Sequence, residues 1–313
     1  MSEEMQVRIS DQVRMRLDKG LTQSQVAQET GISEGALSKY LAGTYGADTN
    51  KLEAKLQKWL DMADRRSALA LAAPDWQETP SAQRMRGIIE AAHLTLDIGL
   101  IAGWPGMGKT MTARQYQATH PRVYMATMSP DTTTVPAALE EVALALDLTV
   151  KPSQGGNHMR RAIVRALTGK GALLILDEVQ HLQHKTLEVM RAIYDQAGIG
   201  LVLMGNGTLL DLVGGAGAVS SNDIKRPLAQ LNSRSGFRVT VSHPSREDVA
   251  VICAAWGVTD KKSVDLLAKA AGRPGALRDV TKVLKSAKLA AIGLGESITH
   301  RLVLAAFDER MNG

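Results

Sequence analysis

The stretch Gly103–Thr110, which reads Gly-Trp-Pro-Gly-Met-Gly-Lys-Thr, has the composition and spacing of a phosphate-binding loop. Its three glycines permit backbone angles at which successive N–H groups converge on a polyphosphate at a helix N-terminus. Lys109 then reaches the β- and γ-phosphates, and the Thr110 hydroxyl can bind Mg²⁺. The structural alternative is a glycine turn between a strand and a helix. The predicted nucleotide-binding residues are Gly103, Pro105, Gly106, Met107, Gly108, Lys109, Thr110 and Met111.

A pair of acidic residues, Asp177 and Glu178, follows the apolar run 173–176 about 70 residues after this loop. We expect Asp177 to hold Mg²⁺ and Glu178 to polarise the water that attacks the γ-phosphate of ATP. An apolar strand that ends in two acids is common by itself, so the assignment depends on the loop that precedes it. Together the two motifs predict an ATPase.

Three further polar residues could complete such a site. Asn206 has the amide needed to orient the attacking water, although an asparagine before Gly207 also suits a turn. Arg234 precedes an apolar segment, where an arginine can enter the site of a neighbouring subunit; a solvated surface arginine is the alternative. Arg278 begins a long helix and could reach the phosphates from a small helical lid, or only begin a basic helix face.

Apolar runs alternate with helical patterns from Asp97 onward, which predicts an α/β domain with a mostly parallel sheet covered by helices. Because ligands collect at the carboxyl ends of such strands, the loops that follow them should carry the chemistry. The expected strands are 98–102, 123–127, 172–176, 200–204 and 237–241.

The segment 21–41 has the pattern of a helix-turn-helix. Thr22 can cap a first helix, Gly31 permits the tight turn, and Ser33 can cap a second helix. A small helical packing module is the structural alternative. The residues expected to present polar atoms to a DNA groove are Ser33, Glu34, Ser38 and Lys39.

Charge is balanced in this N-terminal region, because the first 66 residues contain ten basic and ten acidic side chains. Weak attraction to phosphate follows, so DNA affinity here should depend on many copies that act together. The predicted domains are a helix-turn-helix domain at 1–64, a linker at 65–82, a nucleotide-binding domain at 83–243 and a helical lid at 244–313.

Two further helices carry basic residues that could contact DNA phosphates. Arginines cluster near one face of the helical segment 159–165, and lysines recur at helical spacing after Arg278. A solvated helix face is the alternative in both cases. The candidate phosphate contacts are Arg160, Arg161, Lys282, Lys285 and Lys288.

Taken together, these motifs resemble those of the AAA+ ATPases. With its helix-turn-helix and short helical C-terminus, the chain is similar to the Mu B-like transposition proteins of bacteriophages, above all in the segments 200–206 and 274–278. The resemblance implies an AAA+ P-loop core with the phosphate-loop strand central in the sheet. Gln180 and His181 match no motif position, and neither receives a role.

The same resemblance implies a function. It is that of a DNA-stimulated ATPase that binds double-stranded DNA with little sequence preference, forms ATP-dependent helical filaments on target DNA, and recruits and activates a DDE transposase. Two related alternatives remain open, a helicase loader and an insertion-sequence helper ATPase. A transcriptional repressor with a regulatory ATPase is a third, and it predicts a strong preference for one palindromic site.

Composition is compatible with this interpretation. The chain has 313 residues with 44% hydrophobic content, enough for about two domains, and carries a formal net charge of +5. No apolar run approaches the roughly 20 residues of a membrane span, so we expect a cytoplasmic protein without a membrane partner. Aromatic residues make up only 4%, which favours a grip on duplex backbone over stacking on single strands.

Overall fold

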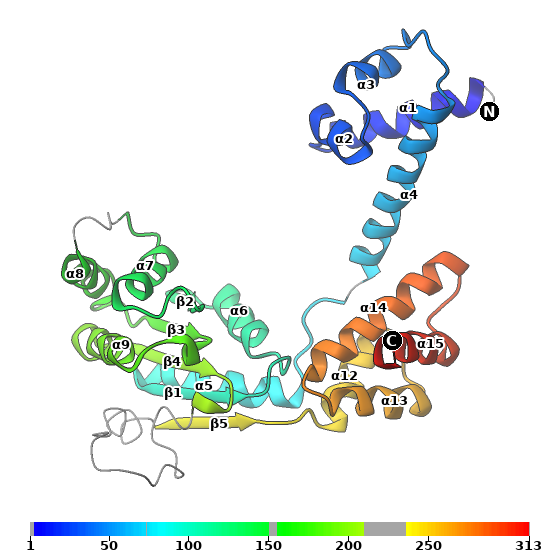
Figure 1. Cartoon of the computed structure of the whole chain (residues 1–313). Coiled ribbons are helices and arrows are strands. Elements are labelled where there is room, and N and C mark those ends of the chain that lie inside the picture. The colour runs from blue at the N-terminus through cyan, green and yellow to red at the C-terminus, as the bar shows by residue number, and fades with distance from the viewer. Residues whose placement is uncertain (1–2, 73, 150–154, 210–235, 313) are drawn as a thin grey trace. The chain divides into compact units, whose positions relative to one another are not determined.

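The computed structural model describes residues 3–72, 74–149, 155–209 and 236–312, and Figure 1 shows their elements. The chain divides into two compact units. The first contains Met1–Ala73 and Lys288–Ser297, and the second contains Pro74–Ala287 and Ile298–Gly313. No helix of the described residues is long and apolar enough to cross a membrane.

The N-terminal unit is a helix-turn-helix. Its helices are α1 (Glu3–Asp18), α2 (Gln23–Thr30), α3 (Glu34–Leu41) and α4 (Asn50–Ala72). Thr22 caps α2 in a capping box with Gln25, and the Ser33 hydroxyl caps α3, as the sequence predicted. Gly31 makes the turn between the two helices with a φ of 63°. Their apolar faces, with those of α1 and α4, enclose one small core.

The segment predicted as a linker, 65–82, is helical over much of its length. Helix α4 continues to Ala72, because the Ala- and Leu-rich run after Arg66 consists of strong helix formers and contains no proline before Pro74. Helix α5 (Pro80–Thr95) begins with a proline in its first turn, where the missing N–H costs nothing, and Thr79 caps it.

The second unit is built on a five-stranded sheet whose neighbouring strands are all parallel. The strand order is β2-β3-β4-β1-β5. The strands are β1 (Ile98–Gly103), β2 (Val123–Thr127), β3 (Leu173–Asp177), β4 (Gly200–Gly205) and β5 (Phe237–Val241). The expectation of a central phosphate-loop strand was wrong, because β4 is the middle strand and β1 lies between β4 and β5.

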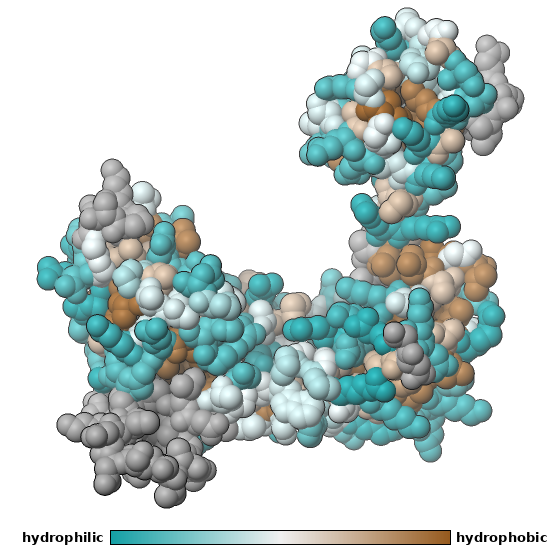
Figure 2. Space-filling view, viewed as in Figure 1, coloured by the Kyte–Doolittle hydropathy of each residue, from teal (hydrophilic) through white to brown (hydrophobic). Residues whose placement is uncertain are grey.

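Helices cover both faces of this sheet (Figure 1). One face packs against α7 (Val135–Ala145), α8 (Gly156–Leu167) and α9 (His184–Ala197). The other packs against α5 and α6 (Lys109–Thr119). Because β1, β3 and β4 are buried on both sides, they consist of nearly continuous apolar residues. The visible outer surface of the unit is mostly hydrophilic (Figure 2).

Four helices follow β5, and all of them belong to this unit except residues 288–294 at the end of the third. They are α12 (Arg246–Ala255), α13 (Lys261–Ala271), α14 (Ala276–Leu294) and α15 (His300–Asn312). Asp248, which is fully buried on α12, fastens these helices to α5. Its carboxylate accepts hydrogen bonds from the Ser81 N–H at 2.8 Å and the Ser81 hydroxyl at 2.7 Å.

Candidate nucleotide-binding site

The phosphate-binding loop joins the end of β1 to the start of α6. Gly106 and Gly108 have φ angles of 85° and 88°, in the region that favours glycine. A Cβ at Gly106 would lie 2.0 Å from the carbonyl oxygen of Gly275, at the turn before α14. Glycine at position 106 therefore allows the C-terminal helices to touch the loop.

Lys109 is almost fully buried at the start of α6. Its ammonium donates hydrogen bonds to the carbonyl oxygens of Gly103 at 2.8 Å and Trp104 at 3.0 Å. Burial lowers the pKa of Lys109 below its ordinary value, while the negative charges of Glu178 and Asp177 oppose this shift. The loop thus holds a cation next to the N-terminus of a helix, a combination that attracts phosphate.

Thr110 and Asp177 meet across the site. The Thr110 hydroxyl donates to Asp177 Oδ2 at 2.6 Å, and Asp177 Oδ1 accepts the N–H of Glu178 at 2.9 Å. Burial raises the pKa of Asp177 above its ordinary value, and the Thr110 hydrogen bond opposes that shift. A hydroxyl and a carboxylate at one point are hard oxygen donors, which fit Mg²⁺.

Glu178 links β3 to the short helix η2 (Val179–His181) in a left-handed conformation, with φ 54° and ψ 38°. A residue other than glycine in this region carries a backbone strain of roughly 1 kcal/mol or more, and such residues cluster at functional sites. The Gln180 amide donates to the Glu178 carboxylate at 2.5 Å, and its carbonyl oxygen accepts the N–H of Asn206 at 3.2 Å. The described structure therefore brings Glu178 and Asn206 together through Gln180.

The remaining predicted nucleotide-binding residues differ in their surroundings. Met107 is 1% exposed in the core, so only its backbone faces the loop interior, whereas Met111 is 51% exposed on α6. Pro105 is exposed. Arg278 lies in the first turn of α14 beside the loop, and its charge contributes to the lowered pKa of Lys109. Arg234 lies outside the described residues.

The predicted DNA contacts lie on separate elements. All four candidates on α3 and its cap are exposed, namely Ser33, Glu34, Ser38 and Lys39. On α14, Lys282 and Lys285 are exposed, whereas Lys288 is half-buried.

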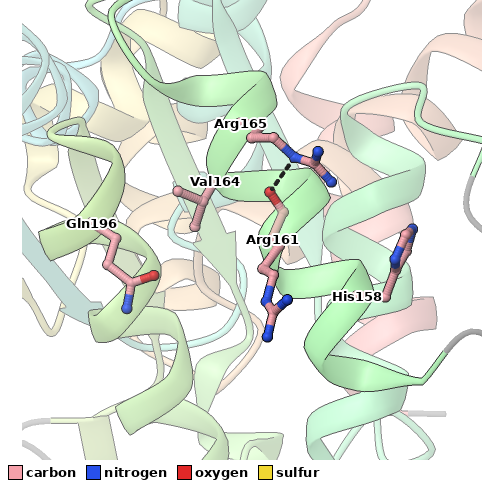
Figure 3. A pocket seen from close by; sticks show the side chains of 5 residues that line it. All are labelled: His158, Arg161, Val164, Arg165 and Gln196. Atoms are coloured by element: carbon pink, nitrogen blue, oxygen red, sulfur yellow. Dashed lines mark hydrogen bonds between the residues drawn. The ribbon is translucent and has the colours of Figure 1, made fainter.

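On α8, Arg161 is exposed, and Arg160 donates to Gln196 of α9 at 2.6 Å. A depression of about 390 Å³ lies between these two helices, with Arg161 and Arg165 on one side and Gln196 on the other (Figure 3). His158 and Val164 complete its lining.

The parallel sheet, the loop between β1 and α6 and the acidic pair at the end of β3 define a P-loop ATPase of the AAA+ class. Family models agree, because one described as AAA domain matches residues 94–213 and one described as helix-turn-helix matches 14–54. A third, described as Mu B transposition protein, C terminal, matches 233–309.

Two relatives extend the likeness over most of the chain. The ATP-dependent target DNA activator B of Escherichia phage Mu is 33% identical over 289 residues, which are 92% of this chain and 90% of that protein. The Mu-like prophage FluMu DNA transposition protein B of Haemophilus influenzae is 31% identical over 266 residues, 85% and 91% of the two chains. The chain therefore belongs to the Mu B family of transposition proteins.

A solved structure supports the fold alone. The Aeropyrum pernix ORC1 protein, determined in complex with DNA, superimposes with a TM-score of 0.52 at 18% identity. The match covers 76% of this chain and 66% of that protein.

Proposed function

We propose that this protein is an ATP-dependent target DNA activator, which binds duplex DNA as an oligomer and delivers it to a DDE transposase. The observation that carries the proposal is the 33% identity to the phage Mu activator over 92% of the chain. The phosphate-binding loop and the acidic pair that follows β3 support the ATP dependence. This likeness favours a transposition factor over a helicase loader, an insertion-sequence helper or a transcriptional repressor.

In this proposal the loop residues bind ATP and the acidic pair serves its hydrolysis. Lys109 would balance the charge of the β- and γ-phosphates, and Arg278 would approach them from α14. Thr110 and Asp177 would hold Mg²⁺, which when bound neutralises charge on the phosphate oxygens. Their direct hydrogen bond at 2.6 Å supports this pairing of donors.

Glu178 would act as the general base. Its carboxylate takes a proton from water as the water oxygen bonds to the γ-phosphorus, and the bond from that phosphorus to the β-phosphate oxygen breaks, which releases ADP. Asn206 would orient the water by its side-chain amide. Gln180 links Glu178 to the backbone N–H of Asn206. The side-chain oxygen of Asn206 accepts hydrogen bonds from the N–H and the hydroxyl of Thr208, so its NH₂ group would be the one to hold the water.

Assembly would be the main consequence of ATP binding. Arg234 of one copy would complete the site of the next copy, so nucleotide would join protomers into a helical filament and hydrolysis would release them. A filament suits the weak grip of each copy, because α3 carries a single basic residue and the Ser24 hydroxyl holds Glu34 at its first turn. Basic residues of α8 and α14 would add phosphate contacts.

Two variants test this function. Lys109→Ala should lose ATP-dependent binding to duplex DNA, whereas Glu178→Gln should bind ATP and DNA and hydrolyse ATP at least about 100-fold more slowly, because a general base typically contributes that much. Fluorescence anisotropy would measure binding to duplex DNA, electron microscopy would detect filaments, and phosphate release would measure ATP hydrolysis.

Each part of the proposal has its own contrary result. ATP hydrolysis at the normal rate by Glu178→Gln would mean that Glu178 is not the general base. A wild-type protein that stays monomeric with ATP and duplex DNA present would overturn the filament. Small closed rings on DNA would instead favour a loader, and one strongly protected palindromic site in a footprint would favour a repressor.

A further inference from the structure

Gln180 occupies a position between two parts of the site that belong to different strands. It lies in η2, two residues after Glu178, and its side chain reaches the end of β4 at Asn206. The sequence contains no familiar motif that assigns this glutamine a role. Its two hydrogen bonds point to one.

The orientation of the Gln180 amide follows from its partners. The Glu178 carboxylate only accepts hydrogen bonds, so it must face the NH₂ group, which lies 2.5 Å from Oε2. The backbone N–H of Asn206 only donates, so it must face the carbonyl oxygen, at 3.2 Å. Both ends of the amide are therefore used in the only arrangement that satisfies both neighbours.

Close packing leaves this side chain little freedom. A Cβ at Gly205 would lie 2.7 Å from the Gln180 carbonyl oxygen, so β4 approaches Gln180 as closely as it does because residue 205 is glycine. Gln180 is also partly shielded from solvent. Its hydrogen bond to a charged carboxylate is thus held in one geometry, in which it is stronger than a bond between neutral groups.

We propose that Gln180 is a positioning residue for ATP hydrolysis, which orients the Glu178 carboxylate and ties it to the end of β4. The amide holds Oε2 and leaves the other carboxylate oxygen to accept the proton of water. Because the same amide is bonded to Asn206, a displacement at the end of β4 is transmitted to Glu178. This inference rests on the role proposed above for Glu178.

The first test removes the amide without removing its bulk. Gln180→Leu should lower kcat for ATP hydrolysis about tenfold, the usual effect of losing one hydrogen bond to a charged group. KM for ATP and the affinity for a fluorescent ATP analogue should change less than about twofold, because the Gln180 hydrogen bonds in the described structure go to Glu178 and Asn206 and not to Lys109 or Thr110. Unchanged kcat, or a change confined to KM, would overturn the proposal.

A second variant supplies a readout that a purely structural role would not move. In Gln180→Glu the introduced carboxylate repels Glu178 at neutral pH, but once protonated it can donate to Glu178 and still accept from Asn206. The ratio of Gln180→Glu to wild-type activity should therefore rise as the pH falls from about 8 to about 5.5. The ratio for Gln180→Leu should stay flat. Parallel ratios for both variants would contradict the orienting hydrogen bond.

A pair of glycine variants gives a matched control on the same turn. Gly205→Ala should displace the Gln180 carbonyl and lower kcat by a similar factor. Gly207→Ala should leave kcat unchanged, because among the described residues no heavy atom beyond its chain neighbours lies within 4 Å of such a Cβ. In the Gln180→Leu background, Gly205→Ala should cost little more, since both act on one contact. Additive losses of kcat would mean that Gly205 and Gln180 act independently, which would contradict the proposal.

Failure of this inference can be distinguished from failure of the proposed function. If Glu178→Gln hydrolyses ATP slowly while Gln180→Leu is normal, only the role of Gln180 is wrong. If Glu178→Gln is itself normal, the general base is another group, and both assignments fall. Thermal unfolding of each variant would identify any loss of activity that comes from loss of fold.

Discussion

At the scale of single residues, the position of Gly106 illustrates how one missing side chain allows two parts of the fold to touch. Its φ of 85° restricts the backbone, and a Cβ added there would lie 2.0 Å from the Gly275 oxygen, so two different requirements favour glycine. Gly108 shares only the first, because it has a φ of 88° and, in the described part of the chain, no heavy atom beyond its neighbours in sequence lies within 4 Å of such a Cβ. The two glycines therefore separate backbone strain from steric conflict.

Alanine at each position should lower stability by different amounts without nucleotide. Gly108→Ala should cost about 1 kcal/mol, from the left-handed backbone alone. Gly106→Ala should cost about 2 kcal/mol or more, because the loop or the turn at Gly275 must also move. Urea unfolding of both variants would measure this difference, and equal losses would mean that the contact is easily relieved.

At the same scale, Gln180 shows why part of the site escapes sequence analysis. Lys109, Asp177 and Glu178 belong to motifs whose spacing is diagnostic, so their positions could be predicted without a structure. Gln180 acquires significance only because the left-handed turn at Glu178 points its amide at β4. The local signal, a glutamine two residues after the acidic pair, does not reveal which strand it will meet.

At the scale of elements, β1, β3 and β4 were predictable because parallel strands covered on both faces must be apolar throughout. The predicted bounds of β2 and β5 are those of the structure, β1 and β4 each extend one residue further, and β3 is shifted by one residue at both ends. Helix α4 was underestimated, since its Ala-rich end after Arg66 has no amphipathic pattern and depends on helix propensity. Strand order could not be derived, because periodicity says nothing about neighbours.

The buried Asp248 is the element-scale contact that most affects stability. Its carboxylate accepts two hydrogen bonds from Ser81 and another from the Ser245 N–H at 2.7 Å. Asp248→Ala should leave buried donors unpaired and destabilise the second unit by about 3 kcal/mol. The exposed Asp265, which pairs with Arg246, is a matched control whose alanine variant should cost at most about 1 kcal/mol. Thermal unfolding would measure the unfolding midpoint of both variants. Equal shifts of the midpoint would contradict the role of Asp248 in fastening α12 to α5.

The same carboxylate predicts a pH dependence. Burial by itself raises the pKa of Asp248, but the hydrogen bonds from Ser81 and Ser245 outweigh it and leave the pKa below its ordinary value. A group whose pKa is lower in the folded state contributes stability above its unfolded pKa of about 3.9, and this contribution is lost as the pH falls through the folded pKa. Acid titration of the unfolding midpoint should therefore show a shallower decline in Asp248→Ala than in the wild type.

At the scale of the whole molecule, the question is which basic surface holds DNA. If α14 contacts phosphates, replacing Lys282, Lys285 and Lys288 by alanine should weaken binding to all duplex sequences alike and reduce the slope of log affinity against log salt by up to about three. Replacing Arg160 and Arg161 on α8 should reduce it by up to about two on the same reasoning. Anisotropy titrations over a range of salt would measure both slopes. If affinity and slope stay unchanged, the helix that carries the replaced residues does not contact DNA phosphates.

The contact between Gly275 and Gly106 makes the start of α14 a pivot at the phosphate-binding loop. The helix has 19 residues, so at 1.5 Å per residue it extends about 28 Å from that pivot. A tilt of about 10° would swing its far end by about 5 Å while Arg278, close to the pivot, moves by less than about 1 Å. Small displacements at the phosphate-binding loop would thus become larger displacements along α14, and a force on the other end of the helix would act on the loop.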